Sequence, residues 1–474
     1  MQHSVLISAL AFALATQSPE SARAQASASP IVATDTGRVQ GDVEDGIASW
    51  KGIPFAAPPT GALRWRMPQK PKPWPGVRKT TAYANDCMQR PFGGDAAPLG
   101  TAPAEDCLYL NVWKPTGVKH GLPVIFWIYG GGFANGGASP PTYSGANLAR
   151  QGVMFVSINY RVGRFGVFAH PALTKADEDK GLLGNYGFMD QIAGLKWVKR
   201  NIAAFGGDPN NITIIGQSAG GRSVHNLMTS PLAHGLFARA VVMSGGGGAA
   251  GSDGLAETEA RGVAFAEGKG IAAADPAALA KLRALTGDQV VDGLNLIYKS
   301  PTFAGPFVDG RIAVNPLEAY RAGRYNHVPL MIGATSNDNG GPTGSQPYGA
   351  RNTAGILSDQ GLPVYEYRYS YVAESLGANN GAHHASDIPF FFDTQKIKYG
   401  DKTTPRDMAA GRIASAYIVN FAKTGNPGGP GLPPWPRYSR SGDVIMNFTA
   451  EGSAAAGKDP IGDKLDTPPA ATPR

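Results

Sequence analysis

Residues 212–221, Ile-Thr-Ile-Ile-Gly-Gln-Ser-Ala-Gly-Gly, constrain the fold of this chain more than any other segment. The β-branched run at 212–215 predicts a buried strand, and the residues after the glycines are compatible with a helix. Between them, Gly216 and Gly220 flank Ser218 in the spacing of a sharp strand-to-helix turn that exposes a nucleophilic serine. A Cβ at either glycine would collide where the strand and the helix meet. We therefore interpret Ser218 as a strained nucleophile rather than as a serine that only caps a helix.

Composition limits the classes of protein that remain. The 474 residues are 42% hydrophobic and 17% charged, which suits one large α/β domain. The formal charge is +7, but the basic residues are scattered, and the densest group, at 70–79, is interrupted by prolines. This pattern does not favour nucleic-acid binding or attachment to an anionic membrane. No His/Cys cluster suggests a metal, and we expect no cofactor.

The N-terminus predicts export. An apolar run at 5–15 is too short to span a bilayer and leads into an Ala-x-Ala pattern that ends at Ala24. Residues 1–24 are predicted to be a secretory signal peptide, with Ala26 as an alternative cleavage position. Export fits the cysteine content, an even pair, because disulfides persist in oxidising compartments. The sequence predicts a secreted or periplasmic protein without stable membrane insertion.

Apolar runs alternate with helical patterns through the rest of the chain. Residues 190–205 carry apolar side chains at spacings of three and four, which predicts a helix. Continuous apolar runs, which suit strands covered on both faces, occur at 123–129, 153–160, 238–243, 328–332 and 364–372. The alternation predicts a mostly parallel, doubly wound sheet flanked by helices, within a single domain over 25–466.

Three segments lie outside this alternation. Residues 37–55 alternate and turn as an antiparallel hairpin does, and residues 250–300 predict helices that cap the site. The C-terminal residues 467–474 are expected to be a disordered tail.

A serine nucleophile needs a base and an acid that orients the base. In an α/β-hydrolase the acid and then the histidine follow the serine along the chain. His383 and His384 occupy a glycine-flanked loop after the run at 364–372, whereas the other histidines lie in positions typical of structural or solvated side chains. Asp338 is the only carboxylate in the loop after the run at 328–332. The alternative for Asp338 is a turn aspartate that bonds its own backbone.

Acyl transfer also needs donors for the oxyanion of the tetrahedral intermediate. Tyr-Gly-Gly-Gly-Phe at 129–133 follows a predicted buried strand and offers bare backbone N–H groups. Gly131 and Gly132, with the N–H of Ala219, predict a three-donor oxyanion hole. A phosphate-binding loop is the alternative for these glycines, but no Gly-Lys-Ser/Thr follows them.

From about residue 37 to 448 the chain resembles the type-B carboxylesterases, the α/β-hydrolases related to cholinesterases. Besides the elbow and the glycine loop, the motifs that carry the likeness are Glu-Asp-Cys-Leu-Tyr-Leu-Asn-Val at 105–112, Asn-Tyr-Arg at 159–161, Gly-Gly-Asp-Pro at 206–209, Ser-Pro-Leu at 230–232, Met-Ser-Gly at 243–245 and Phe-Ala-Lys-Thr-Gly-Asn-Pro at 421–427. The resemblance implies an α/β-hydrolase fold with a helical cap. It assigns Ser218 as nucleophile, Asp338 as acid and His384 as base, since Asp-Ile-Pro-Phe follows His384 at the family's offset.

The resemblance also implies two supporting features, a disulfide between Cys87 and Cys107 and a Ser244 side chain that contacts the triad.

Four departures from the family pattern stand close to the predicted site, and one is Asp338 itself, since the family's acid is more often Glu. The family usually has Glu where Gln217 stands, and a small residue where Arg222 stands. Only 46 positions separate Asp338 from His384, where the family has a longer helical insertion. The cap is therefore expected to be reduced. The shortening predicts either a shallower, more open pocket with broad ester tolerance or an incompletely formed site.

The resulting expectation is a serine carboxylesterase that hydrolyses small-molecule carboxylic esters through an acyl-enzyme. A cholinesterase-like binding module without turnover and an acyltransferase that uses the same acyl-enzyme are the alternatives. The natural ester and the oligomeric state do not follow from the sequence.

Overall fold

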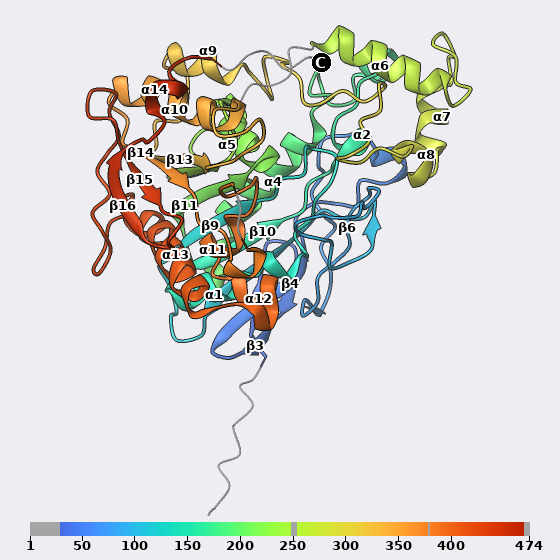
Figure 1. The fold of residues 1–474 in the computed structure, drawn as a ribbon. Coiled ribbons are helices and arrows are strands. Elements are labelled where there is room, and N and C mark those ends of the chain that lie inside the picture. The colour runs from blue at the N-terminus through green and yellow to red at the C-terminus, as the bar shows by residue number, and fades with distance from the viewer. Residues whose placement is uncertain (1–28, 248–253, 378–379, 469–474) are drawn as a thin grey trace, which may run out of the picture.

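A large mixed sheet organises the molecule (Figure 1). The structure, a computed structural model, describes residues 29–247, 254–377 and 380–468. The sheet has 11 strands in the order β16-β15-β14-β13-β12-β11-β9-β10-β8-β4-β3. Neighbouring strands from β15 across to β10 are parallel, and the pairs at both edges are antiparallel. The mostly parallel sheet predicted from the sequence is confirmed.

The strands of this sheet have the following bounds: β3 Asp42–Glu44, β4 Ile47–Pro54, β8 Tyr109–Pro115, β9 Leu122–Ile128, β10 Met154–Ile158, β11 Gly207–Gln217, β12 Arg239–Met243, β13 Leu330–Thr335, β14 Val364–Tyr369, β15 Val444–Phe448 and β16 Ala454–Lys458. All residues of β10 and β13 are buried, as expected for strands covered on both faces. The continuous apolar runs seen in the sequence at 153–160 and 328–332 therefore form buried strands inside the sheet.

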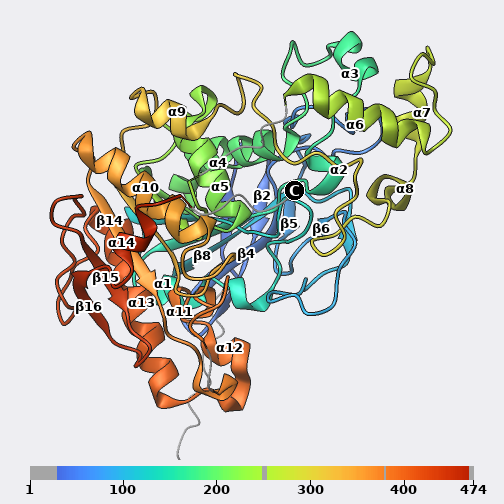
Figure 2. The same ribbon diagram turned by 45° about the horizontal axis from the view of Figure 1, so that its top comes forward.

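Helices cover both faces of the sheet (Figures 1 and 2). On one side lie α4 Tyr186–Phe205, α5 Ala219–Thr229, α9 Pro316–Arg321 and α10 Ser345–Asp359. On the other lie α1 Ala146–Arg150, α11 Ile388–Phe391, α12 Gln395–Tyr399 and α13 Pro405–Thr424. Helix α4 ends where Gly206 takes a left-handed backbone with φ of 97°. The helix predicted at 190–205 thus exists and begins one turn earlier.

The N-terminal hairpin is shorter than predicted. Strands β3 and β4 pair antiparallel, but β2, Arg38–Gln40, belongs to a separate small sheet with β1, Ile31–Ala33, and β5, Val77–Lys79. Gly41 separates the two sheets, and a Cβ there would collide with Trp50. The strand therefore breaks at Gly41, and its two halves find different partners.

The segment expected to be a helical cap is only partly helical. It contains α6 Leu255–Glu267, α7 Ala278–Ala284 and α8 Gly287–Val291, which lie to one side of the sheet (Figures 1 and 2). The helical prediction is wrong for 292–300, which form an irregular loop. Asp292 and Gly293 both have positive φ, 51° and 72°, and this left-handed backbone ends the helix.

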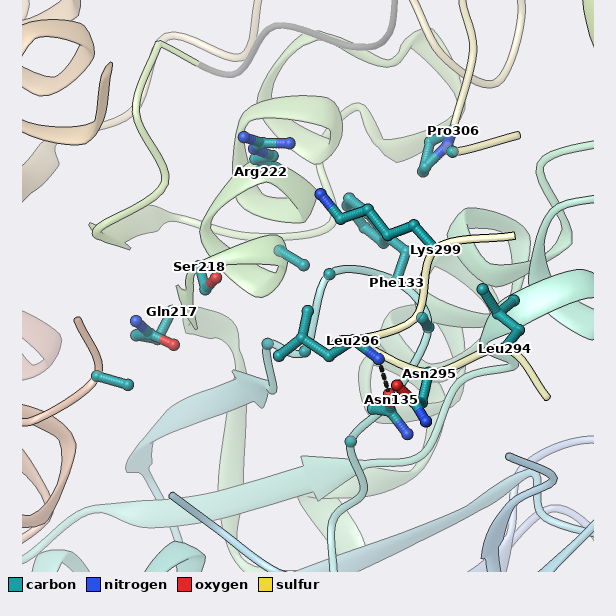
Figure 3. Close-up of a pocket in the computed structure, with 18 of the residues that line it drawn as sticks. Phe133, Asn135, Gln217, Ser218, Arg222, Leu294, Asn295, Leu296, Lys299 and Pro306 are labelled. Atoms are coloured by element: carbon teal, nitrogen blue, oxygen red, sulfur yellow. Dashed lines mark hydrogen bonds between the residues drawn. The ribbon is translucent and has the colours of Figure 1, made fainter. Parts of the chain in front are cut away.

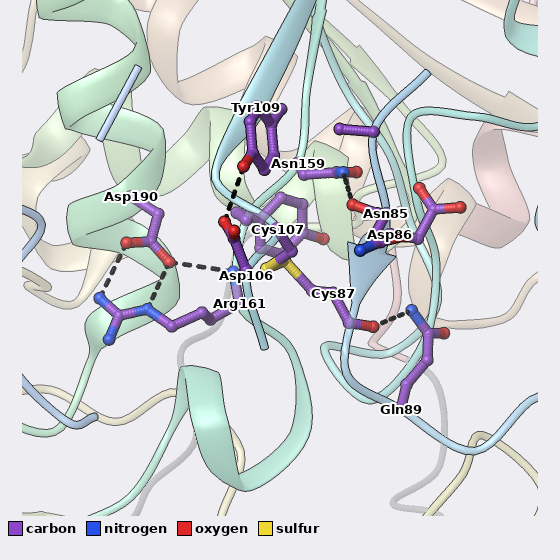
Figure 4. Close-up of a disulfide and its surroundings, with 12 residues drawn as sticks. Asn85, Asp86, Cys87, Gln89, Asp106, Cys107, Tyr109, Asn159, Arg161 and Asp190 are labelled. Atoms are coloured by element: carbon purple, nitrogen blue, oxygen red, sulfur yellow. Dashed lines mark hydrogen bonds and ion pairs between the residues drawn. A yellow bond between two sulfur atoms is a disulfide. The ribbon is translucent and has the colours of Figure 1, made fainter. Parts of the chain in front are cut away.

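A disulfide and a buried ion pair stabilise the loops beside the sheet (Figure 4). Cys87 and Cys107 are bonded, joining β6, Asp86–Cys87, to the segment that leads into β8. In the same region Arg161 binds Asp190 of α4 through two hydrogen bonds of 2.8 Å, and both side chains are buried. The disulfide that the resemblance implied is present.

The remaining strands and α-helices of the described chain are short: β7 Pro103–Ala104, α2 Gly163–Gly166, α3 Pro171–Ala176 and α14 Gly462–Leu465. Short 3-10 helices occur at Gly61–Leu63, Pro141–Tyr143, Pro231–Ala233, Glu374–Leu376 and Gly400–Lys402. The signal peptide predicted at 1–24 lies outside the described residues, as does the tail from residue 469 onward. Among the helices of the described ranges, none has the length and apolar character needed to cross a bilayer.

Candidate active site

Ser218 stands at the junction of β11 and α5 in a strained backbone conformation. Its φ of 59° and ψ of −121° lie in a region that residues with a side chain rarely adopt. A Cβ on Gly216 would collide with the Gly220 carbonyl, and one on Gly220 would collide with the Ile128 carbonyl. The sequence-based expectation that a Cβ would collide at both glycines is therefore confirmed. The close backbone approach that these glycines permit places Ser218 at the end of the strand.

Three side chains distant in sequence form a hydrogen-bonded chain. Ser218 Oγ lies 2.7 Å from His384 Nε2, and His384 Nδ1 lies 2.6 Å from Asp338 Oδ1. Ser218 and His384 are half-buried and line a cavity, while the Asp338 side chain is fully buried. The order is the one that proton transfer from a serine through an oriented imidazole requires.

The Asp338 carboxylate accepts several hydrogen bonds besides the one to His384. Its Oδ2 accepts from Ser244 Oγ at 2.6 Å and from Thr335 Oγ1 at 2.8 Å, and Oδ1 accepts from the Asn339 N–H at 2.7 Å. Burial raises the pKa of Asp338. The hydrogen bond and charge of His384, together with the hydrogen bonds from Ser244 and Thr335, outweigh this effect and hold the pKa below its usual value. Asp338 is therefore both a turn aspartate and a partner of His384.

The histidine loop is attached directly to the acid loop. The Asn337 N–H donates to the Ala382 carbonyl at 2.9 Å, and Asn337 pairs with His383 in a parallel bridge. His383 itself is exposed and faces the Asn337 side chain, so it does not reach Asp338. The structure thus distinguishes the two adjacent histidines and brings His384 to the site.

The glycine loop after β9 lies against the serine. A Cβ on Gly130 would collide with Ser218 Cβ, so only a glycine permits this approach. The N–H groups of Gly131, Gly132 and Ala219 make no hydrogen bond to other described residues, and all three residues line the cavity beside Ser218. Three residues with unused N–H donors therefore line the same cavity as Ser218.

Gln89, which follows the disulfide, holds the far end of the glycine loop. Its amide donates to the Gly136 carbonyl at 2.6 Å and accepts from the Gly136 N–H at 2.9 Å. It also accepts from Asn135 Nδ2 at 3.0 Å. Asn135 in turn accepts a bond of 2.6 Å from the Leu296 N–H (Figure 3). Gln89 was not found by sequence reasoning, because nothing in the local sequence marks a residue that acts across 47 positions.

The cavity in front of Ser218 has a volume of about 850 Å³. Its walls come from the glycine loop, residues 92–97, the start of α5 and residues 294–306. Figure 3 shows Phe133 of the first wall, Arg222 of α5 and Leu296 of the last. Leu296 lies against Gly132, where an added Cβ would touch its side chain. The loop at 292–300 that replaced the predicted helix thus forms one wall of the cavity.

Asp387 is a second carboxyl group close to the site. It is fully buried, and no side chain among the described residues donates a hydrogen bond to either carboxylate oxygen. Burial, reinforced by the neighbouring Asp338 charge, raises the pKa of Asp387 to about 7. In the sequence, Asp387 served only as part of the motif that favoured His384 over His383. Nothing in the local sequence indicated that its side chain would be buried.

A parallel sheet with a strained serine at a strand–helix junction defines the class of α/β-hydrolases. The family model described as "Carboxylesterase family" matches residues 28–346 and 346–460. Fumonisin B1 esterase of Sphingopyxis macrogoltabida is 32% identical over 480 residues, covering 89% of this chain and 86% of that protein. Para-nitrobenzyl esterase of Bacillus subtilis (strain 168) is 32% identical over 468 residues, covering 86% of this chain and 92% of that protein.

Solved structures agree with this relationship. A PNB esterase structure superposes with a TM-score of 0.81 at 29% identity, covering 93% of this chain and 99% of that chain. The Geobacillus stearothermophilus carboxylesterase EST55 gives 0.79 at 32% identity, covering 92% of this chain and 99% of that chain. The chain belongs to the carboxylesterase family, has the α/β-hydrolase fold and is a carboxylic ester hydrolase.

Asp387 gives the protein a pH-dependent stability. Because its pKa is raised in the folded state, the folded protein keeps a proton that the unfolded chain releases between about pH 4 and pH 7. Stability therefore falls as pH rises through this window. Asp387→Asn imitates the protonated form, so its free energy of unfolding relative to the parent should increase by on the order of 2 kcal/mol between pH 4.5 and pH 8.

Urea denaturation at both pH values measures this difference. Asp401→Asn, at an exposed carboxyl, is the matched control and should show no such increase. If the difference in free energy of unfolding between Asp387→Asn and the parent is the same at pH 4.5 and pH 8, the carboxyl is ionised in the folded protein at both pH values, and the raised pKa is wrong.

Proposed function

We propose that the chain is an exported serine carboxylesterase that hydrolyses small-molecule esters through an acyl-enzyme. Ser218 is the nucleophile, His384 the general base and acid, and Asp338 the group that orients His384. The observation that carries the proposal is the pair of short hydrogen bonds, 2.7 and 2.6 Å, that connect Ser218 to Asp338 through His384. Both ends of the imidazole have a partner at the wall of an open cavity.

Acylation begins when Ser218 Oγ attacks the ester carbonyl carbon and His384 Nε2 takes the hydroxyl proton. Asp338 accepts from Nδ1–H, which fixes the tautomer and stabilises the imidazolium that forms. The bond from the carbonyl carbon to the alcohol oxygen then breaks, and His384 donates its proton to that oxygen. In deacylation His384 takes a proton from water as the water oxygen attacks the acyl carbon. The bond from the acyl carbon to Ser218 Oγ then breaks, and His384 returns the proton to Oγ.

The oxyanion formed at each tetrahedral step is assigned to the N–H groups of Gly131, Gly132 and Ala219. None of these donors is used by other described residues. A donor in such a hole contributes about 3 kcal/mol to stabilisation of the transition state. Gly131 has φ of 108° and Gly132 has φ of 63°, so the loop depends on residues without a side chain at both positions.

The size of the cavity supports broad ester tolerance. A volume of about 850 Å³ lies in the upper part of the range for small-molecule sites. The relatives are named for fumonisin B1 and for para-nitrobenzyl esters, and we extend to this chain only the hydrolysis of small-molecule esters. The contacts of Ser218, His384 and Asp338 argue against an incompletely formed site and against a binding module without turnover.

Ser218→Ala should abolish hydrolysis of p-nitrophenyl butyrate, with kcat reduced at least about 1,000-fold, because the variant lacks the hydroxyl that forms the acyl-enzyme. A fluorophosphonate should label the parent protein and fail to label the variant. Ser439→Ala, at an exposed serine remote from the cavity, is the control and should retain both properties. Full activity of Ser218→Ala with an unchanged denaturation midpoint would refute the assignment.

Gln89→Ala should lower kcat about tenfold with a smaller change in KM. The substitution removes the bonds that hold Gly136 and Asn135, so the donors of the glycine loop would no longer be fixed at the oxyanion. Gln69→Ala, which loses one bond to the Met67 carbonyl, is the matched control. A Gln89→Ala enzyme with parental kcat would show that the loop keeps its geometry without this clamp.

Export is supported by the apolar N-terminal run and by the disulfide, which an oxidising compartment would maintain. Expressed with its own N-terminus in a bacterial host, the protein should accumulate outside the cytoplasm with a new N-terminus at Gln25 or Ser27. Intact-mass analysis with and without reductant should show two alkylatable thiols only after reduction. A cytoplasmic product that retains Met1 would contradict the export proposal.

A further inference from the structure

The charged residues that line the cavity are mostly cationic. Among the described lining residues, three are basic, Arg222, Arg261 and Lys299, and one is acidic, Asp95. The Asp95 carboxylate accepts a hydrogen bond from the Ala97 N–H in its own loop. Gln217, beside Ser218, is neutral where the family usually places a glutamate. The cavity therefore presents an excess of positive charge to whatever enters it.

Arg222 is the strongest element of this charge. It lies four residues after Ser218 on α5, so the two residues share one face of the helix. Every other residue of α5 is buried, whereas Arg222 is exposed to the cavity. Within the described part of the chain, its guanidinium has neither a hydrogen bond nor an ion pair. By contrast, the buried arginines Arg64, Arg161 and Arg351 each form an ion pair with an Asp or Glu.

Protein atoms nevertheless pack around much of the Arg222 side chain, although part of it remains exposed in the cavity. This desolvation lowers the pKa of Arg222 from its usual value, but a guanidinium remains charged at neutral pH. A cation that is partly removed from water and lacks a counter-ion gains strongly from an anion that reaches it.

Asn226 adds a second donor that lacks a partner. It lies one turn after Arg222 on the same face of α5 and also lines the cavity. The residue is only 3% exposed, and its Nδ2 has no hydrogen-bond partner among the described residues. Buried amide groups are normally bonded, and because this Nδ2 atom is itself enclosed, the side chain would have to rotate to offer its N–H to an acceptor atom of a ligand in the cavity.

Lys299 supplies a third donor from the opposite wall. In Figure 3 its side chain extends from the 294–301 loop toward Arg222, and it is exposed in the same cavity. The loop has a defined shape, because Asn295 Oδ1 accepts from the N–H groups of Ile297 and Tyr298 at 2.9 and 2.8 Å. Lys299 is therefore presented by a structured loop and has no partner among the described residues.

We propose that Arg222, Asn226 and Lys299 form an anion subsite that binds a carboxylate of the substrate, so that the preferred esters carry a free carboxylate near the scissile bond. The inference rests on the proposed function, because it takes Ser218 as the attacking group. Four helical residues span about 6 Å along the axis, so the carboxylate would lie roughly three to five bonds from the scissile carbonyl. Half-esters of short dicarboxylic acids have this spacing, as do acyl esters of hydroxybenzoic acids.

Two substrate pairs test the subsite and locate the carboxylate. Monomethyl glutarate against methyl pentanoate places the charge on the acyl side, and 3-acetoxybenzoate against 3-methylphenyl acetate places it on the alcohol side. The selectivity is the ratio of kcat/KM for the anionic ester to kcat/KM for its neutral partner. The parent should prefer the anionic ester in at least one pair, and added salt should weaken that preference.

Arg222→Gln should lower this ratio about tenfold or more, because it removes a charged donor and leaves a polar side chain. Lys299→Gln should lower the ratio less, since Lys299 is more exposed, and Arg222→Lys should keep part of it. Lys119→Gln removes the same charge from an exposed position that does not line the cavity, and it should leave both rates unchanged. If Arg222→Gln leaves the ratio unchanged in both pairs while neutral esters are hydrolysed, the subsite is wrong and the esterase assignment stands.

Calorimetry separates the two proposals if no ester is hydrolysed. Such a result would overturn the proposed function, and the subsite would then be tested by titrating glutarate into Ser218→Ala and into Ser218→Ala/Arg222→Gln. Binding by the first protein that is lost or at least tenfold weaker in the second supports the anion subsite. Equal binding by both proteins, or binding by neither, overturns it.

Discussion

Ser218 faces the cavity because three backbone segments approach one another without side chains between them. The elbow glycines, Gly216 and Gly220, let the start of α5 contact the ends of β11 and β9, and Gly130 lets the glycine loop contact Ser218 itself. The strained backbone of the serine costs on the order of 1–3 kcal/mol. Its N–H donates to the Met243 carbonyl at 2.8 Å, so the neighbouring strand helps to hold it. The rest of the site is arranged around this fixed point.

The parallel sheet explains why residues distant in sequence meet there. Strands β11, β12 and β13 are neighbours, and the residues that follow their carboxyl ends include Ser218, Ser244 and Asp338 respectively. Loops at the carboxyl ends of parallel strands share one edge of the sheet, which is where α/β proteins place their sites. His384 joins them because backbone pairing between Asn337 and His383 attaches its loop to the acid loop. The short segment between acid and base is sufficient for this arrangement.

A continuous set of contacts links the disulfide to the cavity. The Cys87 carbonyl accepts from Gln89, Gln89 holds Asn135 and Gly136, and Asn135 fixes the Leu296 N–H across the cavity. The glycine loop, whose N–H groups we propose as oxyanion donors, and the wall that carries Lys299 are thus positioned by the same network. The same hydrogen bonds therefore fix both the glycine loop beside Ser218 and the loop from which Lys299 enters the cavity.

The sequence by itself determined the local features: the strand before Ser218, the glycines around it, the glycine loop and the buried runs of the sheet. These follow from periodicity and from steric limits that operate within a few residues. Among histidines, the residues alone narrowed the base to His383 or His384, and only the resemblance favoured His384. Only the tertiary structure gave His384 its contact with Asp338, because the pairing of two loops, 46 positions apart, sets which imidazole faces the acid.

Tertiary structure alone also decided the character of the cavity. Helical propensity gave no warning that the backbone reverses at Asp292 and that the following residues form a wall. The sequence marked Arg222 as unusual, but its exposure to the cavity depends on how α5 packs against the sheet. Local sequence encodes which elements form, whereas the long-range packing of those elements decides which side chains are left to meet a substrate.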